Sequence, residues 1–266
     1  MPPARSKTHE ARRPAGVKSP APAAESRAPA VSRAIRILRI VGDSKTPLGV
    51  NAIARAVDVV PSSCLHILRA LEEEGLLLCD PEKRYTLGLG LVSLARTALS
   101  SAPQAPMLPK ELDHLARISG ATAIAAQLVP RDRMVIVAVS HGSGTFGVHF
   151  DIGRRFPSYV SATGRCVAAY SGLGRAALKR KFDALVWDNP PRFTDWLNQV
   201  EFARREGVGL DQGNYVRGYL ILAAPVFQGG TMVQTLSIVA ANGQVASDRL
   251  ETLKEELRNT AARLSH

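Results

Sequence analysis

The chain has 266 residues, 45% of them hydrophobic, and carries a formal net charge of +11 at pH 7. It contains enough apolar material for a sizeable core in one or two domains, of which we expect two. Three scattered cysteines argue against a disulfide framework or a CxxC metal site. No run approaches the roughly 18 apolar residues of a membrane span and the start lacks a secretory signal, so we expect a cytoplasmic protein with no membrane partner.

Residues 1–30 are predicted to form a disordered basic tail. They are rich in Pro, Ala, Ser and Arg and hold almost nothing that could be buried. The first forty residues contain nine Lys or Arg and two Glu, so most of the net charge lies there. A positive charge of this size attracts nucleic-acid phosphates. The simpler alternative is that the tail only keeps the protein soluble.

Residues 31–87 are predicted to form a winged helix-turn-helix, the unit that places its second helix in the major groove of DNA. Apolar residues recur at helical spacing from Val31 to Val41, from Gly49 to Val57, and again from Pro61. Gly75 is expected to end the third helix in a left-handed conformation. Leu76–Cys79 and Arg84–Leu87 are then expected to pair as a hairpin, the wing, around the turn residues 80–83.

The helix that begins at Pro61 carries the candidate base-reading side chains. Its apolar stripe is Cys64, Ile67, Leu68 and Leu71. The candidates for DNA contact on the opposite side are Ser62, Ser63, His66 and Arg69, and those on the wing are Lys83 and Arg84. The alternatives are that a serine merely caps the helix, that His66 is an ordinary exposed histidine, and that each wing cation is a solvated surface charge.

Residues 88–106 are predicted to form a linker helix that ends in a break. Leu87, Leu91 and Leu94 fall within two helical turns, and the segment SAPQAPMLP follows. An apolar helix between two domains must cover its stripe, and a second copy of the chain is the simplest cover. We therefore expect a dimer.

Residues 107–266 are predicted to form an α+β domain. Strands are expected at 122–129, 133–140, 145–150, 208–211, 219–227 and 231–240, and helices at 111–120, 161–170, 175–182, 193–206 and 247–264. Runs of strands framed by helices favour an antiparallel sheet with helices packed on its faces.

The chain resembles the IclR family of bacterial transcriptional regulators over about residues 31–265. The matching segments are VSRAIRILRIVGD, PSSCLHILRALEEEGLLLCDPEKRYTLGLGLVSLA, DIGRRFPSYVSATGRCVAAYSG, EFARREGVGLDQGNYVRGYLILAAPVF and MVQTLSIVA. The resemblance implies a winged helix-turn-helix, a linker helix and a GAF-like C-terminal domain that binds a small organic effector. It also implies a homodimer or homotetramer on a palindromic operator in double-stranded DNA.

The same resemblance implies an effector site. The matching positions, with their neighbours, are Tyr159, Ser161, Ala162, Thr163, Asp211, Tyr215, Ile221 and Ser237. Two departures from the family pattern, Gln212–Asn214 in place of an acidic run and Ile221 in place of cysteine, make the site less charged or less polar. We therefore expect a larger or more aromatic carboxylic acid than the keto acids of some members. For each position the alternative is ordinary core or turn packing.

An enzyme remains the main alternative interpretation. Cys166 could act as a nucleophile with His149 or His141, or Ser161 could do so with His149 and Asp151. Either arrangement would make the domain a small-molecule hydrolase or transferase. No GxSxG or HExxH pattern supports this, so we expect no catalytic residue, no metal and no cofactor. A third possibility is a non-specific nucleoid-binding protein that uses its basic tail. Our primary prediction is a ligand-responsive, nucleoid-associated transcription factor.

Overall fold

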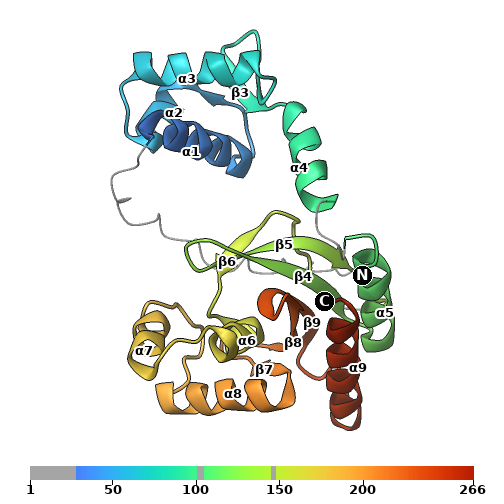
Figure 1. Ribbon diagram of the computed structural model, residues 1–266. Helices are drawn as coiled ribbons and strands as arrows, with labels where there is room; N and C mark the ends of the chain where they lie inside the picture. Colours follow the sequence, from blue (N-terminus) through green and yellow to red (C-terminus); the bar gives the residue numbers. More distant parts are fainter. Residues whose placement is uncertain (1–27, 101–104, 145–147) are drawn as a thin grey trace, which may run out of the picture. The chain divides into compact units, whose positions relative to one another are not determined.

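The computed structural model describes residues 28–100, 105–144 and 148–266 (Figure 1). The chain divides into two compact units, residues 1–101 and 102–266, each of which is described by itself. The predicted basic tail falls outside the described residues up to position 27. Within the described ranges, no helix has the length and apolar character needed to cross a membrane.

The N-terminal unit is a small helical core with a short sheet beside it. Its helices are α1 (Pro29–Asp43), α2 (Val50–Val57), α3 (Pro61–Glu73) and α4 (Gly90–Ser100), and its strands are β1 (Leu48–Gly49), β2 (Leu77–Cys79) and β3 (Arg84–Leu87). The strands pair antiparallel in the order β1-β3-β2. The side chains of Ile37, Ile53, Leu68 and Tyr85 meet in one buried cluster, so the predicted shared core of three helices is present.

Two boundaries in this unit differ from the sequence prediction. Helix α1 begins at Pro29, two residues before Val31, because proline is accommodated in the first turn of a helix. Gly49 belongs to β1, where it pairs with Arg84, and not to the second helix. A two-residue strand leaves no alternation in the sequence by which it could be recognised.

Gly75 has the predicted left-handed conformation, with φ of 67°. Its carbonyl group lies against two further glycines, Gly88 and Gly90, which follow β3. A Cβ atom at Gly88 would lie 2.2 Å from the Gly75 oxygen, so only glycine fits there. The segment Gly88–Gly90, of sequence GLG, therefore closes the wing tightly onto the end of α3.

Helix α4 buries none of its residues within the N-terminal unit. Of the predicted stripe, Leu87 and Leu94 are 41% and 60% exposed and Leu91 is half-buried, and the neighbouring Leu89 and Val92 are 80% and 51% exposed. The apolar stripe predicted for the linker helix is thus left open, and its cover by a second chain stays a prediction.

The C-terminal unit is an antiparallel sheet of six strands in the described residues, ordered β6-β5-β4-β9-β8-β7. The strands are β4 (Thr122–Val129), β5 (Arg133–Ser140), β6 (Arg155–Pro157), β7 (Gly209–Gln212), β8 (Tyr219–Gln228) and β9 (Thr231–Ala241). The helices are α5 (Leu108–Ser119), α6 (Ser161–Tyr170), α7 (Arg175–Asp183), α8 (Phe193–Glu206) and α9 (Leu250–Arg263), the last preceded by a 3-10 turn at Ser247–Arg249.

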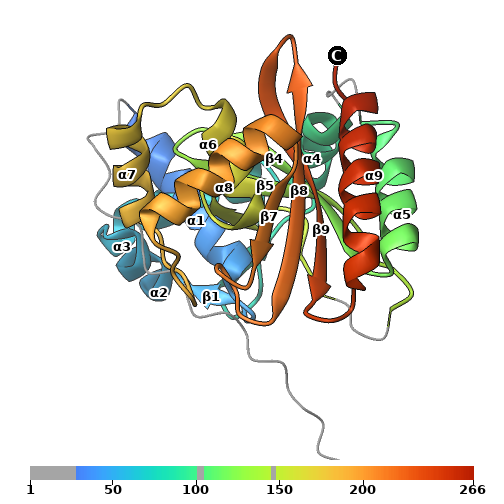
Figure 2. The same ribbon diagram turned by 90° about the horizontal axis from the view of Figure 1, so that it is seen from below.

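The helices cover both faces of this sheet (Figure 2). Helices α5 and α9 pack on one face through residues such as Leu112 and Leu257. Helices α6, α7 and α8 pack on the other through Cys166, Leu178 and Trp196. The predicted α+β class is confirmed.

One predicted strand is wrong. Residues 148–150 are not a strand, and residues 145–147 of that prediction lie outside the described ranges. The edge of the sheet is formed instead by β6, whose three residues pair with Arg133–Val135 of β5. A short segment ending in Pro157 is acceptable only at a sheet edge, and nothing in its sequence alternates.

Candidate functional site

Helix α3 presents its polar side chains to solvent. Its N-cap is Val60, and Pro61 occupies the first helical position. Cys64 and Leu68 are fully buried, while Ser62, Ser63, His66 and Arg69 are exposed. The burial pattern predicted for this helix is therefore present, and the four candidates share its outer side.

Neither serine caps the helix, because the N-cap residue is Val60 and no side chain makes a capping hydrogen bond. The first turn of an α-helix has backbone N–H groups without intrahelical partners, which favour a phosphate. The hydroxyls of Ser62 and Ser63 lie in that turn and can add to it. From Ser62 to Arg69 the outer face extends about 10 Å along the helix axis.

The two wing cations differ in their surroundings. The Nε atom of Arg84 donates to Asp80 Oδ2 over 3.0 Å, and Arg84 also pairs with Glu82. The backbone N–H of Arg84 holds the pKa of Asp80 below its usual value, with the guanidinium adding to the effect. Lys83 is exposed at the tip of the hairpin with a left-handed φ of 60°. Lys83 is thus more available to a phosphate than Arg84.

Four effector-site candidates lie at the start of α6 or just before it, namely Tyr159, Ser161, Ala162 and Thr163. Ser161 starts the helix with a φ of 61°, in the left-handed region that non-glycine residues rarely adopt. A Cβ atom at Gly164 would lie 2.0 Å from the carbonyl carbon of Tyr159, so the turn before α6 closes on a glycine. Such strained, closely packed turns are characteristic of functional sites.

The strands bring further candidates to the same face of the sheet. Asp211 on β7 is paired directly with Ile221 on β8, and Ser237 on β9 with Ala223 on β8. The Ser237 hydroxyl lies 3.4 Å from that of Thr163 on α6. Tyr215 follows β7, and burial raises the pKa of its phenol. Residues from four segments of the chain are thus gathered under α6.

A buried arginine that the sequence reasoning missed links these segments. Arg165 on α6 is fully buried, and its Nη1 donates to Asp211 Oδ2 over 2.9 Å. Its other N–H groups donate to Gln199 on α8 and to Asn214, at 2.7 to 2.9 Å. Burial lowers the pKa of Arg165, and the Asp211 carboxylate opposes that effect.

Asp211 is fully engaged in this network. While one oxygen accepts from Arg165, the other accepts from the backbone N–H of Asn214 over 2.8 Å. The Asp211 charge is therefore neutralised inside the protein and does not repel an anion placed near Thr163. The available signal in the sequence was a cation in the small, apolar helix SATGRCVAAY with no acidic residue within one turn.

Tyr159 stands apart from the other candidates. Its side chain lines a separate hollow between α6 and the hairpins of the sheet, together with Asp132 and Tyr170. The ammonium group of Lys181 lies 6.0 Å from the centre of the Tyr159 ring.

The residues considered for catalysis are not arranged for it. Burial raises the pKa of the Cys166 thiol to about 12, and its sulfur lies 3.2 Å from the carbonyl oxygen of Ala223. His141 and His149 are exposed, and their rings are tilted against each other with 5.4 Å between centroids and 52° between planes. In the part of the chain that the structure describes, no group of three or more His, Cys, Asp or Glu could hold a metal ion.

Two family models match the chain. The model of the IclR helix-turn-helix domain matches residues 30–81, and that of the C-terminal domain of bacterial transcriptional regulator IclR matches residues 97–266. Together they span both structural units.

The chain is also similar to individual proteins at lower identity, and the likeness to solved structures shows the fold alone. The glycerol operon regulatory protein of Streptomyces griseus is 25% identical over 198 residues, which cover 74% of this chain and 78% of that protein. The IclR transcriptional regulator of Alicyclobacillus acidocaldarius has a TM-score of 0.79 at 24% identity, covering 90% of this chain and 98% of its own. An IclR homologue from Microbacterium hydrocarbonoxydans, solved with 4-hydroxybenzoate, has a TM-score of 0.74 at 16% identity, covering 89% and 97%.

Proposed function

Since the chain belongs to the IclR family of bacterial transcriptional regulators, and is therefore a DNA-binding regulator with an effector-binding C-terminal domain, we propose how it recognises each ligand. Helix α3 enters the major groove of a palindromic operator in chromosomal DNA in the cytoplasm. Ser62, Ser63, His66 and Arg69 face the bases and phosphates, and the wing residues Lys83 and Arg84 face the backbone.

One observation carries this proposal. The outer side of α3 is polar and exposed from Ser62 to Arg69, while Cys64 and Leu68 on the inner side are fully buried. A helix held by one apolar stripe is rigid, and its opposite face is free to lie in a groove about 12 Å wide.

Competition binding tests the proposal on the intact protein. Fluorescence anisotropy at about 0.15 M salt should give an affinity for the chain's own promoter region at least about a thousandfold above that for random duplex. Equal affinities for the two duplexes would contradict sequence-specific control and favour a non-specific nucleoid-binding protein.

For the C-terminal unit we propose that a small carboxylic acid, larger or more aromatic than a keto acid, is the effector. Its contacts are Ser161, Ala162, Thr163, Asp211, Tyr215, Ile221 and Ser237, with Tyr159 at the margin. Support comes from the neutralisation of Asp211 by Arg165, which removes the repulsion that a carboxylate would otherwise meet. The Microbacterium hydrocarbonoxydans homologue, solved with an aromatic acid, adds to it.

A thermal-shift screen of aromatic and aliphatic acids tests this effector class, because a ligand that binds only the native state raises the melting temperature. A true effector should lose its shift in Ser237→Ala and change operator affinity in the wild type. If aliphatic keto acids alone stabilised the protein, the proposed class would be wrong.

We further propose that α4 pairs with α4 of a second chain, giving a dimer or a tetramer. The exposed apolar residues Leu89, Val92 and Leu94 support this. Two heads spaced for half-sites about 34 Å apart would match a palindrome. Light scattering should show an even number of chains, and Leu94→Glu should shift the population toward monomer.

A further inference from the structure

A hollow of about 470 Å³ opens between α6 and two hairpins at one end of the C-terminal sheet. Its walls are the β4–β5 turn, the β8–β9 hairpin, and α6 with Ser158 and Tyr159 before it. Of the eight proposed effector contacts, Tyr159 is the one that lines it. The hollow is therefore a different place from the site under the start of α6, and nothing in the proposed function uses it.

The inner surface of this hollow is apolar and partly aromatic. Val167 and Met232 are 4% and 7% exposed, so their apolar surfaces form part of a floor that is already largely covered. The Tyr170 ring packs edge-on against Phe227 at 4.9 Å between centroids, with 84° between the ring planes. Flat rings set beside a methionine side chain favour a planar, apolar ligand.

A buried hydroxyl lines the same hollow. Ser158 is 1% exposed, and its Oγ has no hydrogen-bond partner among the described residues. The backbone N–H of Ser158 donates to the Asp132 carbonyl over 3.0 Å, which holds the residue in the wall. Because an unsatisfied buried hydroxyl is costly, a ligand oxygen that hydrogen-bonds to it would be favoured.

The rim carries an excess positive charge. Arg131 and Asp132, with φ of 68° and 53°, form a strained turn at the mouth of the hollow. Asp132 pairs with Lys181, while Arg131 has no ion pair within the described part of the chain. Asp132 is thus neutralised by Lys181, and Arg131 remains available for an anion.

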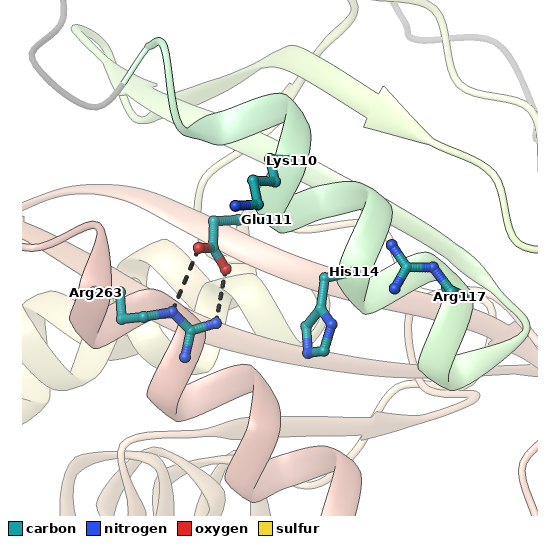
Figure 3. Close-up of a pocket in the computed structure, with 5 residues that line it drawn as sticks. All are labelled: Lys110, Glu111, His114, Arg117 and Arg263. Atoms are coloured by element: carbon teal, nitrogen blue, oxygen red, sulfur yellow. Dashed lines mark hydrogen bonds and ion pairs between the residues drawn. The ribbon is translucent and has the colours of Figure 1, made fainter.

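We propose that this hollow is a second ligand site, for a planar aromatic carboxylate. The ring lies against Tyr170 and Met232, the carboxylate accepts hydrogen bonds from Arg131, and Ser158 binds a ligand oxygen. A second hollow of the unit differs in its lining, which supports the assignment to the first. Between α5 and α9, about 220 Å³ is lined by Lys110, Glu111, His114, Arg117 and Arg263. There Arg263 already reaches Glu111 at 2.7 Å, and the lining residues include no Phe, Tyr or Trp (Figure 3).

Methionine-methyl NMR on the full-length protein tests the proposal. Met232 lines the hollow, while Met107 is 48% exposed in the same unit and lies outside it. Titration with 2-naphthoate should move the Met232 resonance, assigned with Met232→Leu, and saturate below about 1 mM, leaving Met107 unchanged. A folded protein whose Met232 resonance does not respond at ten times that concentration would overturn the proposal.

Variants separate this site from the proposed effector site. Thr231→Trp, at an exposed lining position, should abolish the Met232 response, and Arg131→Gln should raise the dissociation constant at least about fivefold. Arg205→Gln, an exposed arginine on α8, and Ser237→Ala should leave it unchanged.

Two results would count against the assignment. If Ser237→Ala abolished the response and Thr231→Trp did not, the ligand would be in the effector site. If uncharged 2-naphthylmethanol bound as well as 2-naphthoate, recognition of a carboxylate would be wrong. Neither result depends on whether the protein binds an operator.

Discussion

In the N-terminal unit the polar side chains of the candidate site point to solvent, whereas in the C-terminal unit they are buried and hydrogen-bonded to one another. Ser62 and His66 on α3 are exposed, and their side chains make no hydrogen bond or ion pair within the described residues. Arg165 and Asp211 are 0% and 1% exposed and hold α6, α8 and β7 together. The proposed DNA contacts are thus separable from stability, while the proposed effector contacts are part of the core.

The comparison predicts its largest effect at Asp211. Asp211→Ala leaves the Arg165 guanidinium buried without its carboxylate, which should lower the free energy of unfolding by about 3–5 kcal/mol. Both tryptophans, Trp187 and Trp196, lie in this unit, so denaturant unfolding followed by their fluorescence measures the loss.

The double variant Arg165→Met, Asp211→Leu serves as the control. Since it removes both charges, it should recover most of that stability. A loss below about 1 kcal/mol for Asp211→Ala would show that the pair is not part of the core.

A somewhat smaller loss is expected at Gly164. The methyl group of Gly164→Ala would meet the carbonyl of Tyr159, which should cost about 3 kcal/mol and disturb the start of α6. Gly174→Ala is the matched control, since its φ is −72° and nothing lies within 4 Å of the added Cβ. The control should stay within about 1 kcal/mol of the wild type, and equal losses in both variants would refute the close approach.

The same contrast explains what could be predicted from the sequence. The side of α3 that faces solvent follows from the spacing of Cys64 and Leu68 within one helix, so the exposure of Ser62 and His66 was predicted correctly. Strands β4 and β5 followed from continuous apolar runs next to a polar turn.

The Arg165 network could not be predicted in this way. Its partners Gln199, Asp211 and Asn214 lie 34 to 49 residues further along the chain. Neither helical periodicity nor strand alternation encodes a contact at that distance. The edge strand β6 was missed because three residues are too few for any periodicity.

On the DNA side the expected effects are smaller and concern binding rather than stability. Lys83→Ala should reduce the slope of log affinity against log salt by about 0.9, the value for one phosphate contact. Arg84→Ala should change the slope less, because Arg84 is held by Asp80 and Glu82. Anisotropy titrations at salt concentrations from about 50 to about 200 mM measure both slopes. A larger change of slope for Arg84→Ala than for Lys83→Ala would show that Arg84, and not Lys83, is the main phosphate contact of the wing.

The smallest effect is a pH dependence from Cys166, because burial raises the pKa of its thiol from an ordinary value of 9.0 to about 12. Because the native state keeps the proton that the unfolded state releases, this contribution to stability is fully present below about pH 9 and declines as pH rises toward 12. The stability difference between the wild type and Cys166→Ala should therefore shrink above pH 9 in denaturant titrations. Rapid labelling of Cys166 in the native protein at pH 8 would contradict its burial.

The most direct test of the DNA-binding account is the specificity ratio, promoter region against random duplex at about 0.15 M salt, for the wild type and His66→Ala. If the outer face of α3 reads bases, His66→Ala should reduce the ratio by about 1–3 kcal/mol and leave random-duplex affinity unchanged, while His114→Ala on α5 should behave as the wild type. An unchanged ratio when Ser62, Ser63 and His66 are all replaced by alanine in a folded protein would contradict the account.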